Sequence, residues 1–464
     1  MSLEDKLYPL LALYERSPEW IRGGVGRAFR LVPPSWRLGK AFGEFERMNL
    51  EVESWDTEQI AEYQWRELKR TLRHATSYCP YYEAAFLKAG ANVEALRSPE
   101  DLKNLPLLEK QDLIDSRDQL CSRALSSKER LYITTGGSTG VPVGFYLQKG
   151  VSRPKEQAFL EAMWRRAGYD RSARVAVVRG HVTDTRSSGR VIRPDPTRGW
   201  LILSSYHLSD RRWPEYLEAL ESYRPDFLHA YPSAALMMAE FLEKAGQSWR
   251  LPMTAVLCGS ERLTIPQKRL LQKVFGCPVY RWYGHSERVV LAGEGATSEH
   301  FHFFPNYGFT EFGEPDAEGH REVIGTSFHN MAMPLIRYRT GDFVRLLEPD
   351  GERDYPWQAA VEIVGREQEF LISGEGRRIS LTAMNMHDAI FDDLYAVQFF
   401  QDEPGVAELR YVPTSVFRES ALKSIAEGVQ RKLGDDFSLS LRRVEETERT
   451  SRGKHKWLVS KIDP

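Results

Sequence analysis

The residues best suited to chemistry lie in five short motifs, and the first is a loop of glycines and hydroxyls. It follows an expected strand and reads Thr134, Thr135, Gly136, Gly137, Ser138, Thr139, Gly140. Glycines let the backbone turn tightly, so that backbone N–H groups and hydroxyls can surround phosphate oxygens. No GK[ST] follows, which excludes a Walker loop. Taken alone, the loop has a polar β-turn as its structural alternative.

The next two motifs each place a carboxylate beside a glycine. Residues 280–287 read YRWYGHSE, and residues 337–342 read RYRTGD. The ring of Tyr283 offers a stacking face to a base, and Glu287 can hold Mg²⁺, which in turn binds phosphates. Asp342 can accept hydrogen bonds from both hydroxyls of a ribose. The structural alternatives are a core aromatic cluster with a surface acid and a hairpin turn with a solvated aspartate.

Two basic motifs complete the set. Gly365 and Arg366 precede a charged stretch, and residues 451–454 read SRGK near the C-terminus. Lys454 lies on a loop that contains glycine, from which a lysine can reach into a site on a neighbouring domain. The alternative is a basic, solvated tail, which is the usual fate of such residues.

The elements that must position these motifs alternate along the chain from Leu131 onward. Short β-rich runs are followed by helical runs, a pattern typical of layered α/β structure. Upstream, the chain reads mainly as helix, with a regular helical pattern over 57–73 that Asp56 or Thr57 can cap. The downstream pattern predicts strands at 131–134, 175–178, 254–257 and 279–282, and helices at 153–167, 214–222, 234–245 and 266–274.

The length of 464 residues exceeds one ordinary core and predicts several domains. A strand-like run, VEIVG at 361–365, leads into a charged stretch, and we place a domain boundary there. The predicted division is a helical N-terminal arm (1–65), a large ATP- and acyl-binding domain of layered sheets and helices (66–365), and a small α+β C-terminal domain (366–464).

Composition narrows the function classes. The formal net charge is −2, from 63 basic and 65 acidic side chains, which argues against a global nucleic-acid surface. No apolar run is long enough for a bilayer span, and MSLEDK does not resemble a signal peptide. We therefore expect a soluble, cytoplasmic chain.

The four cysteines are expected to be reduced thiols, because they are far apart and form no CxxC pair. They are Cys79, Cys121, Cys258 and Cys277. A zinc site built from Cys258, Cys277 and a nearby histidine is the alternative, and the ligand spacing does not favour it.

The segment 18–42 combines basic and aromatic residues. It carries four arginines and Lys40 against a single acid, Glu19, with Trp20, Trp36 and other apolar residues between them. One interpretation is a helical arm packed on the body of the protein. The other is a surface that contacts an anionic membrane or a partner.

In order and spacing the five motifs resemble those of the adenylate-forming superfamily, and the chain most closely resembles its phenylacetate-CoA ligase and CapK-like branch. Local matches are CPYY at 79–82, LPLLEKQDL at 105–113, YPS at 231–233 and CGSE at 258–261. The resemblance runs from about residue 70 to the end of the chain. It implies an α/β adenylate-forming domain followed by a small, mobile C-terminal domain.

The resemblance also implies a role for each motif residue. Thr134 to Gly140 would embrace the β- and γ-phosphates of ATP, and Ser286 would contact the α-phosphate. Glu287 would bind Mg²⁺, and Lys454 would lie between the substrate carboxylate and the α-phosphate. The nucleotide itself would be held by Tyr283 and Gly284, by Gly259, Ser260 and Glu261 around adenine, and by Asp342 and Arg366 at the ribose.

Four interpretations of function follow. The first is activation of a carboxylic acid as an acyl-adenylate and transfer to CoA. The second keeps the adenylation and passes the acyl group to an amine or sugar, as in surface-polysaccharide synthesis. The third is a non-catalytic scaffold, against which the retained Glu287, Asp342, Arg366 and Lys454 argue. The fourth is an unrelated dinucleotide-binding enzyme, which the lack of a GxGxxG after an N-terminal strand disfavours.

The acyl pocket is expected from Arg179, His181, Tyr231 and His285, each of which has a structural alternative. A cation at Arg179 or His181 would suit an anionic or polar acid rather than bare phenylacetate.

Two departures from related sequences are visible. Gln368 stands where many relatives have an acidic hinge residue, so the hinge of the small domain is not fixed by the pattern. Gly293–Gly295 stands where some relatives have zinc-binding cysteines, and we expect no zinc here.

Overall fold

The structure, a computed structural model, describes residues 7, 10, 13–14, 17–135, 143–181, 190–364, 369–381, 384, 391, 394–414, 417–448 and 456–462, except for the side chains of Glu19, Thr135 and Tyr395. The chain divides into two compact units. Unit 1 comprises 1–132, 145–170 and 280–365, and unit 2 comprises 133–144, 171–279 and 366–464. Each unit is described by itself below.

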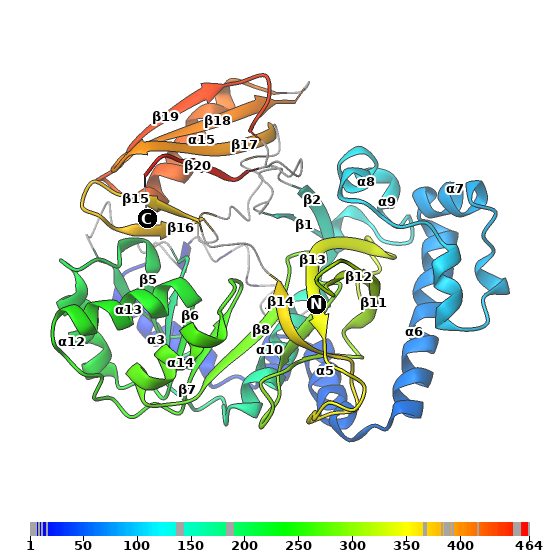
Figure 1. The fold of residues 1–464 in the computed structure, drawn as a ribbon, viewed down its shortest axis with the longest axis horizontal. Helices are drawn as coiled ribbons and strands as arrows, with labels where there is room; N and C mark the ends of the chain where they lie inside the picture. Colours follow the sequence, from blue (N-terminus) through cyan, green and yellow to red (C-terminus); the bar gives the residue numbers. More distant parts are fainter. Residues whose placement is uncertain are drawn as a thin grey trace. The chain divides into compact units, whose positions relative to one another are not determined.

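The N-terminal part of unit 1 is helical (Figure 1). The α-helices are α3 (Glu19–Arg30), α4 (Pro34–Arg37), α5 (Lys40–Glu51), α6 (Thr57–Tyr78), α7 (Pro80–Lys88), α8 (Lys110–Asp115), α9 (Arg117–Leu120) and α10 (Ser152–Arg166). Short 3₁₀ helices are η2 (Val52–Ser54), η3 (Val93–Ala95), η4 (Pro99–Asn104) and η5 (Ser127–Glu129). The hairpin of β1 (Arg130–Thr135) and β2 (Val143–Gln148) begins and ends in this unit.

The longest of these helices, α6, has the start that the sequence predicts. The Asp56 side chain accepts a hydrogen bond from Gln59 N at 2.8 Å, and the Gln59 side chain accepts one from Asp56 N at 3.0 Å. This reciprocal capping satisfies two backbone donors of the first turn. The helix ends before Pro80, which forces Cys79 into an extended conformation. Asp56 is therefore the cap, and the helix continues past the expected Arg73 to Tyr78.

The rest of unit 1 is an antiparallel sheet. Its strands are β8 (Val279–Gly284), which starts at the unit boundary, β9 (Leu291–Glu294), β10 (Phe301–Phe303), β11 (Gly308–Pro315), β12 (Arg321–Ser327), β13 (Tyr338–Leu346) and β14 (Ala359–Val364). Their order is β11-β12-β13-β14-β10-β9-β8. Helix α10 lies against α5, where the Phe45 and Phe159 rings are 6.1 Å apart, and Phe159 meets Phe304 and Tyr307 edge-on.

Unit 2 is built on parallel strands. These are β3 (Val175–Arg179), β5 (Trp200–Ser204), β6 (Phe227–Ala230) and β7 (Ala255–Gly259), with the antiparallel β4 (Ile192–Asp195) at one edge. The 3₁₀ helix η6 (Ser205–His207) and helices α12 (Trp213–Tyr223), α13 (Pro232–Lys244) and α14 (Ile265–Phe275) alternate with them (Figure 1). The strands are almost wholly apolar because helices cover them, and the helix and strand side chains form one core.

The C-terminal part of unit 2 has its own sheet. Strands β17 (Leu394–Glu403), β18 (Val406–Pro413), β19 (Ser438–Arg443) and β20 (Leu458–Ser460) are ordered β19-β18-β17-β20, and β15 (Phe370–Ile372) pairs with β16 (Arg378–Ser380). Helix α15 (Ser420–Leu433) buries Ile425, Val429 and Leu433 in the same core as β17 and β18. The Tyr206 side chain, from η6, is part of this core.

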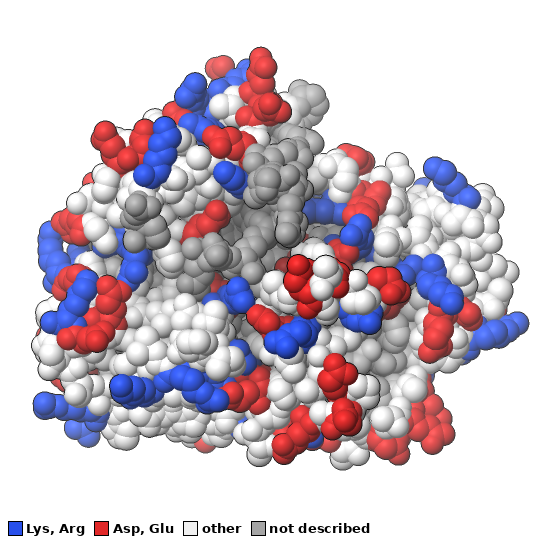
Figure 2. Space-filling view, in the orientation of Figure 1, with Lys and Arg blue, Asp and Glu red and all other residues white. Residues whose placement is uncertain are grey.

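The strands and helices predicted from the sequence are confirmed, with ends that move by one or two residues except at the end of α6, which lies five residues past the expected Arg73. The expected boundary at Gly365 coincides with the end of a unit 1 segment, whereas the expected large domain is shared between the two units. The three-part division stays a prediction. Over the face in Figure 2, basic and acidic side chains are interspersed, as the balanced composition implies.

A buried ion pair ties β8 to β9 just before the YGHSE motif. Arg281 is 8% exposed and Glu294 is 3% exposed. Arg281 Nε donates to Glu294 Oε1 at 2.7 Å, and Arg281 N donates to Glu294 Oε2 at 2.9 Å. Removing one partner of such a pair leaves an uncompensated charge in the core.

We predict that Glu294→Ala lowers the free energy of unfolding by about 3–5 kcal/mol, because Arg281 would stay buried without its carboxylate. Denaturant unfolding measures the change. The control is Glu362→Ala in the same sheet, which removes the partly exposed pair with Arg345 and should cost less than about 1 kcal/mol. Equal losses in the two variants would contradict the proposed role of the buried pair.

Candidate active site

Two hydrogen bonds between tyrosines and carboxylates join the second and third motifs. Tyr283 in β8 donates to Asp342 Oδ2 at 2.8 Å, and Tyr338 in β13 donates to Glu287 Oε1 at 2.9 Å. Strands β8 and β13 are not hydrogen-bonded neighbours in the sheet. Side chains four residues apart on each segment therefore bridge to the other segment, and both predicted carboxylates lie in one place within unit 1.

Burial keeps both tyrosines protonated. It raises the pKa of Tyr283 and of Tyr338 well above the ordinary value, and the adjacent carboxylates raise them further. Each phenol is thus a fixed donor at neutral pH. The two carboxylates are half-exposed, and Glu287 Oε2 makes no hydrogen bond within the described part of the chain. An oxygen in that position fits a divalent cation, because Mg²⁺ takes one or two protein carboxylates and keeps the rest of its shell for water and phosphate.

The RTGD motif lies within strand β13, at an irregularity in the pairing of this strand with β12. Gly341 has φ of +73°, a backbone conformation that residues other than glycine rarely adopt. The Thr340 hydroxyl donates to Val323 O at 2.8 Å and accepts from Asp342 N at 3.1 Å. These bonds fix the backbone at Asp342 to the neighbouring strand, so the motif is part of the sheet and not a hairpin turn.

Helix α10 contacts the chain at the end of the YGHSE motif. Arg288, which follows Glu287, has φ of +57° and donates to Ser152 O at 2.9 Å. Its Nε lies 3.9 Å from Glu156 Oε1, and Glu156 accepts a hydrogen bond from the Tyr307 hydroxyl. These contacts hold the residue after Glu287 in an uncommon backbone conformation.

Next to this network, Lys155 is buried. Its Nζ donates to Tyr307 O at 2.8 Å and lies 3.4 Å from the centre of the Tyr307 ring. Burial lowers its pKa from the ordinary 10.5 to about 7, and the nearby Arg288 adds to the shift while Glu156 opposes it.

His285 stands between Tyr283 and Glu287 in the motif. The centres of the His285 and Tyr283 rings are 6.0 Å apart. Both ring nitrogens of His285 are shielded from water and have no hydrogen-bond partner in the described structure. A buried polar group without a partner is costly, so His285 is well placed to bond a polar ligand group. Ser286 and Gly284, in the same stretch, are half-buried.

In unit 2 a second group of predicted residues meets at the carboxyl ends of the parallel strands. Arg179, at the end of β3, bonds His229 Nε2 at 2.7 Å and donates to Ser260 Oγ at 2.6 Å. Its guanidinium lies 4.5 Å from the Tyr231 ring centre. Strand ends in parallel sheets are where ligands bind in open α/β folds.

The histidines beside Arg179 are neutral. Burial lowers the pKa of His229 well below its ordinary value and that of His181 to about 4, and the positive charge of Arg179 acts in the same direction. The Nδ1 atom of His181 is buried without a hydrogen-bond partner in the described chain. The cluster therefore places a cation beside neutral histidines, and the nearby Glu261 carboxylate interacts with that cation electrostatically.

The CGSE segment has a structural role beside its predicted one. Ser260 has φ of +72°, and the Glu261 carboxylate accepts from Ser233 N at 2.9 Å, at the start of α13. Ser380 of β16 donates to Glu261 Oε1 at 2.5 Å. Burial raises the pKa of Glu261 against the effect of these hydrogen bonds.

Several predicted residues lie outside the described part of the chain. These are Gly136, Gly137, Ser138, Thr139, Gly140, Arg366 and Lys454, together with the side chain of Thr135. Thr134 is buried at the end of β1, and Gly259 ends β7. The assignments of all site residues stay predictions. What the structure adds is that Tyr283, Glu287 and Asp342 meet in unit 1, and Arg179, Tyr231 and Ser260 meet in unit 2.

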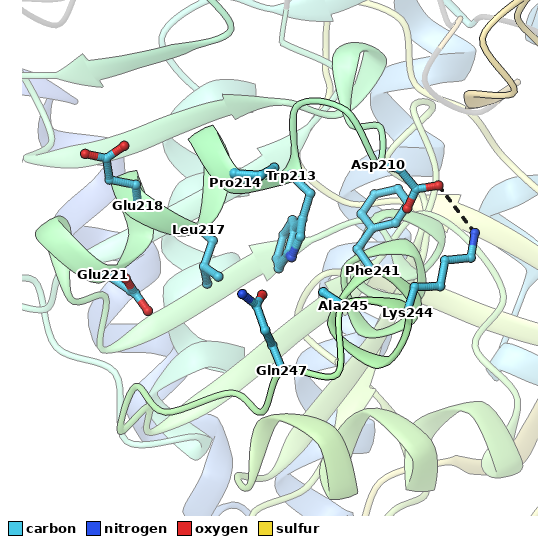
Figure 3. Close-up of a pocket in the computed structure, with 10 residues that line it drawn as sticks. All are labelled: Asp210, Trp213, Pro214, Leu217, Glu218, Glu221, Phe241, Lys244, Ala245 and Gln247. Carbon is cyan, nitrogen blue, oxygen red and sulfur yellow. Dashed lines mark hydrogen bonds and ion pairs between the residues drawn. The ribbon is translucent and has the colours of Figure 1, made fainter.

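A separate hollow of about 390 Å³ lies between α12 and α13 (Figure 3). Figure 3 shows the Trp213 ring between Leu217 and Phe241, with the Asp210–Lys244 ion pair of 3.4 Å at one side. No predicted site residue lines it, so it does not belong to either cluster.

The sequence predicts no role for four residues of these clusters: Tyr338, His229, Lys155 and Arg288. For Tyr338 a signal exists, because it precedes Asp342 by four residues, just as Tyr283 precedes Glu287 by four. His229 lies in an apolar strand and Lys155 lies in an ordinary helix, and nothing in the sequence pattern marks either residue.

The four cysteines are buried free thiols, as predicted. No described helix is long and apolar enough to cross a membrane.

The sequence is similar to CapK and to phenylacetate-coenzyme A ligases. It is 23% identical to CapK of Staphylococcus aureus, over 78% of this chain and 81% of CapK. It is 26% identical to the phenylacetate-coenzyme A ligase of Escherichia coli K12, over 64% of this chain and 69% of that protein, and 25% identical to the one from Pseudomonas putida, over 69% and 74%. These matches confirm the resemblance that the motifs predict.

The fold agrees with this resemblance. A structure of 2-hydroxyisobutyryl-CoA ligase in the postadenylation state with R3-HIB-AMP has a TM-score of 0.54 and 15% identity, over 88% of this chain and 90% of the ligase. The same ligase in an open conformation with 2-HIB-AMP and CoA gives 0.52, over 85% and 90%. No protein-family profile matches the chain. The predicted α/β fold of adenylate-forming ligases is confirmed.

The pKa of Lys155 predicts a pH dependence of stability. In the unfolded chain this lysine would titrate near its ordinary 10.5, whereas in the folded protein it titrates at about 7. The unfolded state therefore holds more protons between these values, and stability rises with pH across that window. Relative to Lys155→Met, the wild type should gain roughly 2–4 kcal/mol in free energy of unfolding from pH 7 to about pH 10.

Denaturant unfolding at both pH values measures this difference. Lys128→Met, at an exposed site, is the control and should leave the pH profile of the wild type unchanged. Parallel profiles for the wild type and Lys155→Met would show that the buried lysine does not titrate as described.

Proposed function

We propose that the protein is an ATP-dependent, AMP-forming acid ligase that activates a carboxylic acid as an acyl-adenylate and transfers the acyl group to CoA. The observation that carries the proposal is the pair of crossed hydrogen bonds, Tyr283 to Asp342 and Tyr338 to Glu287. They support the proposal because they bring the carboxylates of Asp342 and Glu287 close to Tyr283. The similarity to phenylacetate-coenzyme A ligases supports the choice of acid and CoA as substrates.

The residues present fit a magnesium nucleotide. Asp342 accepts from Tyr283 through Oδ2, and its half-exposed carboxylate can accept ribose hydroxyls as well. Glu287 would hold Mg²⁺, which supplies charge neutralisation on the phosphoryl oxygens. Lys454 and the glycine/hydroxyl loop, outside the described residues, would add donors around the same phosphates.

The first step needs no general base, because a carboxylic acid is already ionised at neutral pH. A carboxylate oxygen attacks the α-phosphorus, the bond from that phosphorus to the bridging oxygen breaks, and pyrophosphate leaves. Negative charge gathers on phosphoryl oxygens in the transition state, and preorganised donors stabilise it most effectively. Ser286 and Lys454 are the residues we assign to the α-phosphate.

In the second step the CoA sulfur attacks the acyl carbonyl, the bond from carbon to the AMP oxygen breaks, and AMP leaves. The thiol proton is lost to solvent as the sulfur adds. The small C-terminal domain would move between the two steps and withdraw Lys454.

A second candidate changes only the acceptor. CapK matches 81% of its own length to this chain, which is the largest coverage among the relatives compared. An amine or sugar acceptor, as in surface-polysaccharide synthesis, is therefore kept as the alternative for the transfer step.

The Arg179 cluster points to the class of acid. The Arg179 guanidinium, which contacts His229, Ser260 and Tyr231, would pair with a second anionic or strongly polar group on the substrate. A bare aryl acid offers no such group. We therefore propose an acid that carries a further carboxylate, phosphate or hydroxyl group.

Pyrophosphate release with a panel of acids tests adenylation. We expect Glu287→Gln to lower the rate at least about 100-fold, because the phosphates lose their metal ligand. Asp342→Asn should raise KM for ATP by roughly 10- to 100-fold through weakened ribose contacts. Lys454→Ala should abolish most release, and Asp350→Asn, at an exposed site of the same unit, should have no effect.

The same assay distinguishes the acceptors. Steady turnover that rises on addition of CoA supports the ligase, whereas turnover that rises only with an amino sugar supports the second candidate. If no acid produced pyrophosphate release under any condition, the chain would be a non-catalytic scaffold instead.

For the acid, Arg179→Gln should lower kcat/KM for acids with a second anionic group by roughly 10- to 100-fold and change it little for unsubstituted aryl acids. Arg250→Gln, an exposed arginine of the same unit, is the matched control. A wild-type enzyme that preferred an unsubstituted aryl acid would rule out this assignment of Arg179.

A further inference from the structure

The predicted N-terminal arm (1–65) exposes, within residues 17–42, apolar side chains that a folded protein normally buries. Trp20 is 77% exposed, Leu31 is 85% exposed and Trp36 is 73% exposed, and Val25 is 54% exposed. Single exposed hydrophobic residues are common on protein surfaces. Four large ones within one segment of the described chain form a continuous feature that needs a separate explanation.

Helical spacing places most of this exposure on one side of α3. Trp20, Gly24, Arg27 and Leu31 follow each other at intervals of four, three and four residues, and all are exposed. Residues at such spacing share one face of a helix. On the opposite side Gly26 is buried and Phe29 is half-buried, whereas Val25 is exposed. The arm therefore presents an ordered stripe of tryptophan, leucine and arginine to solvent.

The arm is held in this form by contacts of its own. The Arg37 guanidinium lies 5.7 Å from the centre of the Phe29 ring, and the Tyr14 hydroxyl donates to Arg22 O at 3.0 Å. Leu38 N donates to Pro34 O at 2.8 Å and closes α4. The following helix, α5, packs on α10 through Phe45. The exposed stripe is thus carried on a folded arm and not on a loose terminus.

The positive charge of the arm favours binding to an anionic surface. Segment 18–42 holds four arginines and Lys40 against Glu19 alone, whereas the whole chain is nearly neutral. Arg27 and Arg30 flank the exposed apolar positions and are themselves exposed. A second copy of this stripe would bring like charges together, which disfavours self-association. An anionic lipid headgroup layer offers both the phosphates and the apolar boundary that this combination matches.

We propose that the arm docks the protein on an anionic phospholipid membrane, with Trp20, Leu31 and Trp36 entering the boundary between headgroups and acyl chains. Helix α3 is about 18 Å long, too short to cross a bilayer and suited to lying in its surface. The exposed Arg27 and Arg30 would contact lipid phosphates beside the apolar side chains. The proposal concerns attachment only and is independent of the adenylation chemistry.

Vesicle co-sedimentation of the full chain tests the proposal. We expect binding to phosphatidylcholine vesicles that contain phosphatidylglycerol, weak binding to pure phosphatidylcholine, and loss of binding at high salt. The double variant Trp20→Ser, Leu31→Ser should weaken binding to vesicles at least about 10-fold, because two apolar side chains that would enter the lipid are removed. Arg27→Gln with Arg30→Gln should weaken it by roughly 5-fold per charge.

The matched control is Leu87→Ser with Lys88→Gln on α7, which removes an 81% exposed leucine and an adjacent exposed lysine outside the arm. It should bind vesicles like the wild type. Pyrophosphate release by the arm variants should equal that of the wild type, which separates a failure of docking from a failure of the proposed activity or of folding.

Three results would overturn the proposal. The wild type could remain in the supernatant with anionic vesicles, or the arm variants could sediment like the control. Alternatively, light scattering without vesicles could show an oligomer that the Trp20→Ser, Leu31→Ser variant converts to a monomer, which would assign the stripe to a contact between copies of this chain.

Discussion

The candidate site depends on two phenol–carboxylate hydrogen bonds that cross between segments more than fifty residues apart. Neither bond belongs to the sheet ladder, so they add a connection that the backbone pattern does not supply. Because burial holds both phenols protonated, each carboxylate is oriented by a donor that does not titrate near neutral pH. Thr340 fixes the backbone of β13 at Asp342, and Arg288 fixes the turn after Glu287, so the backbone positions both acids as well.

Unit 2 uses a different device to gather its polar groups. The parallel strands β3, β6 and β7 each contribute a residue at or just after their carboxyl ends: Arg179 from β3, Tyr231 after β6 and Ser260 after β7. The apolar strands and covering helices make these strand ends rigid, and the loops leave them polar. The histidines beside the guanidinium are neutral, because burial and the positive charge of Arg179 both lower their pKa.

Local sequence patterns predict most of the fold but only part of the candidate site. The Asp56 cap, the Pro80 stop and the alternation of apolar strands with helices are properties of short windows, so the sequence predicts them directly. The motif residues Glu287 and Asp342 were found because glycine and hydroxyl neighbours mark them. The sequence predicts a stacking role for Tyr283 and none for Tyr338, and it predicts neither hydrogen bond, because both bonds join segments that are far apart in the chain. His229 and Lys155 are polar residues in apolar surroundings, and only tertiary packing shows what they contact.

The hydrogen bond from Ser380 to Glu261 joins the C-terminal part of unit 2 to a carboxyl group whose pKa is raised. While β16 is in place, burial dominates and holds the proton affinity of this acid above that of a solvated glutamate. The Ser380 hydrogen bond favours the ionised form of this acid, whereas burial favours the protonated form. The state of a single carboxyl group at the start of α13 is thus set by two opposing contributions, and β16 supplies one of them.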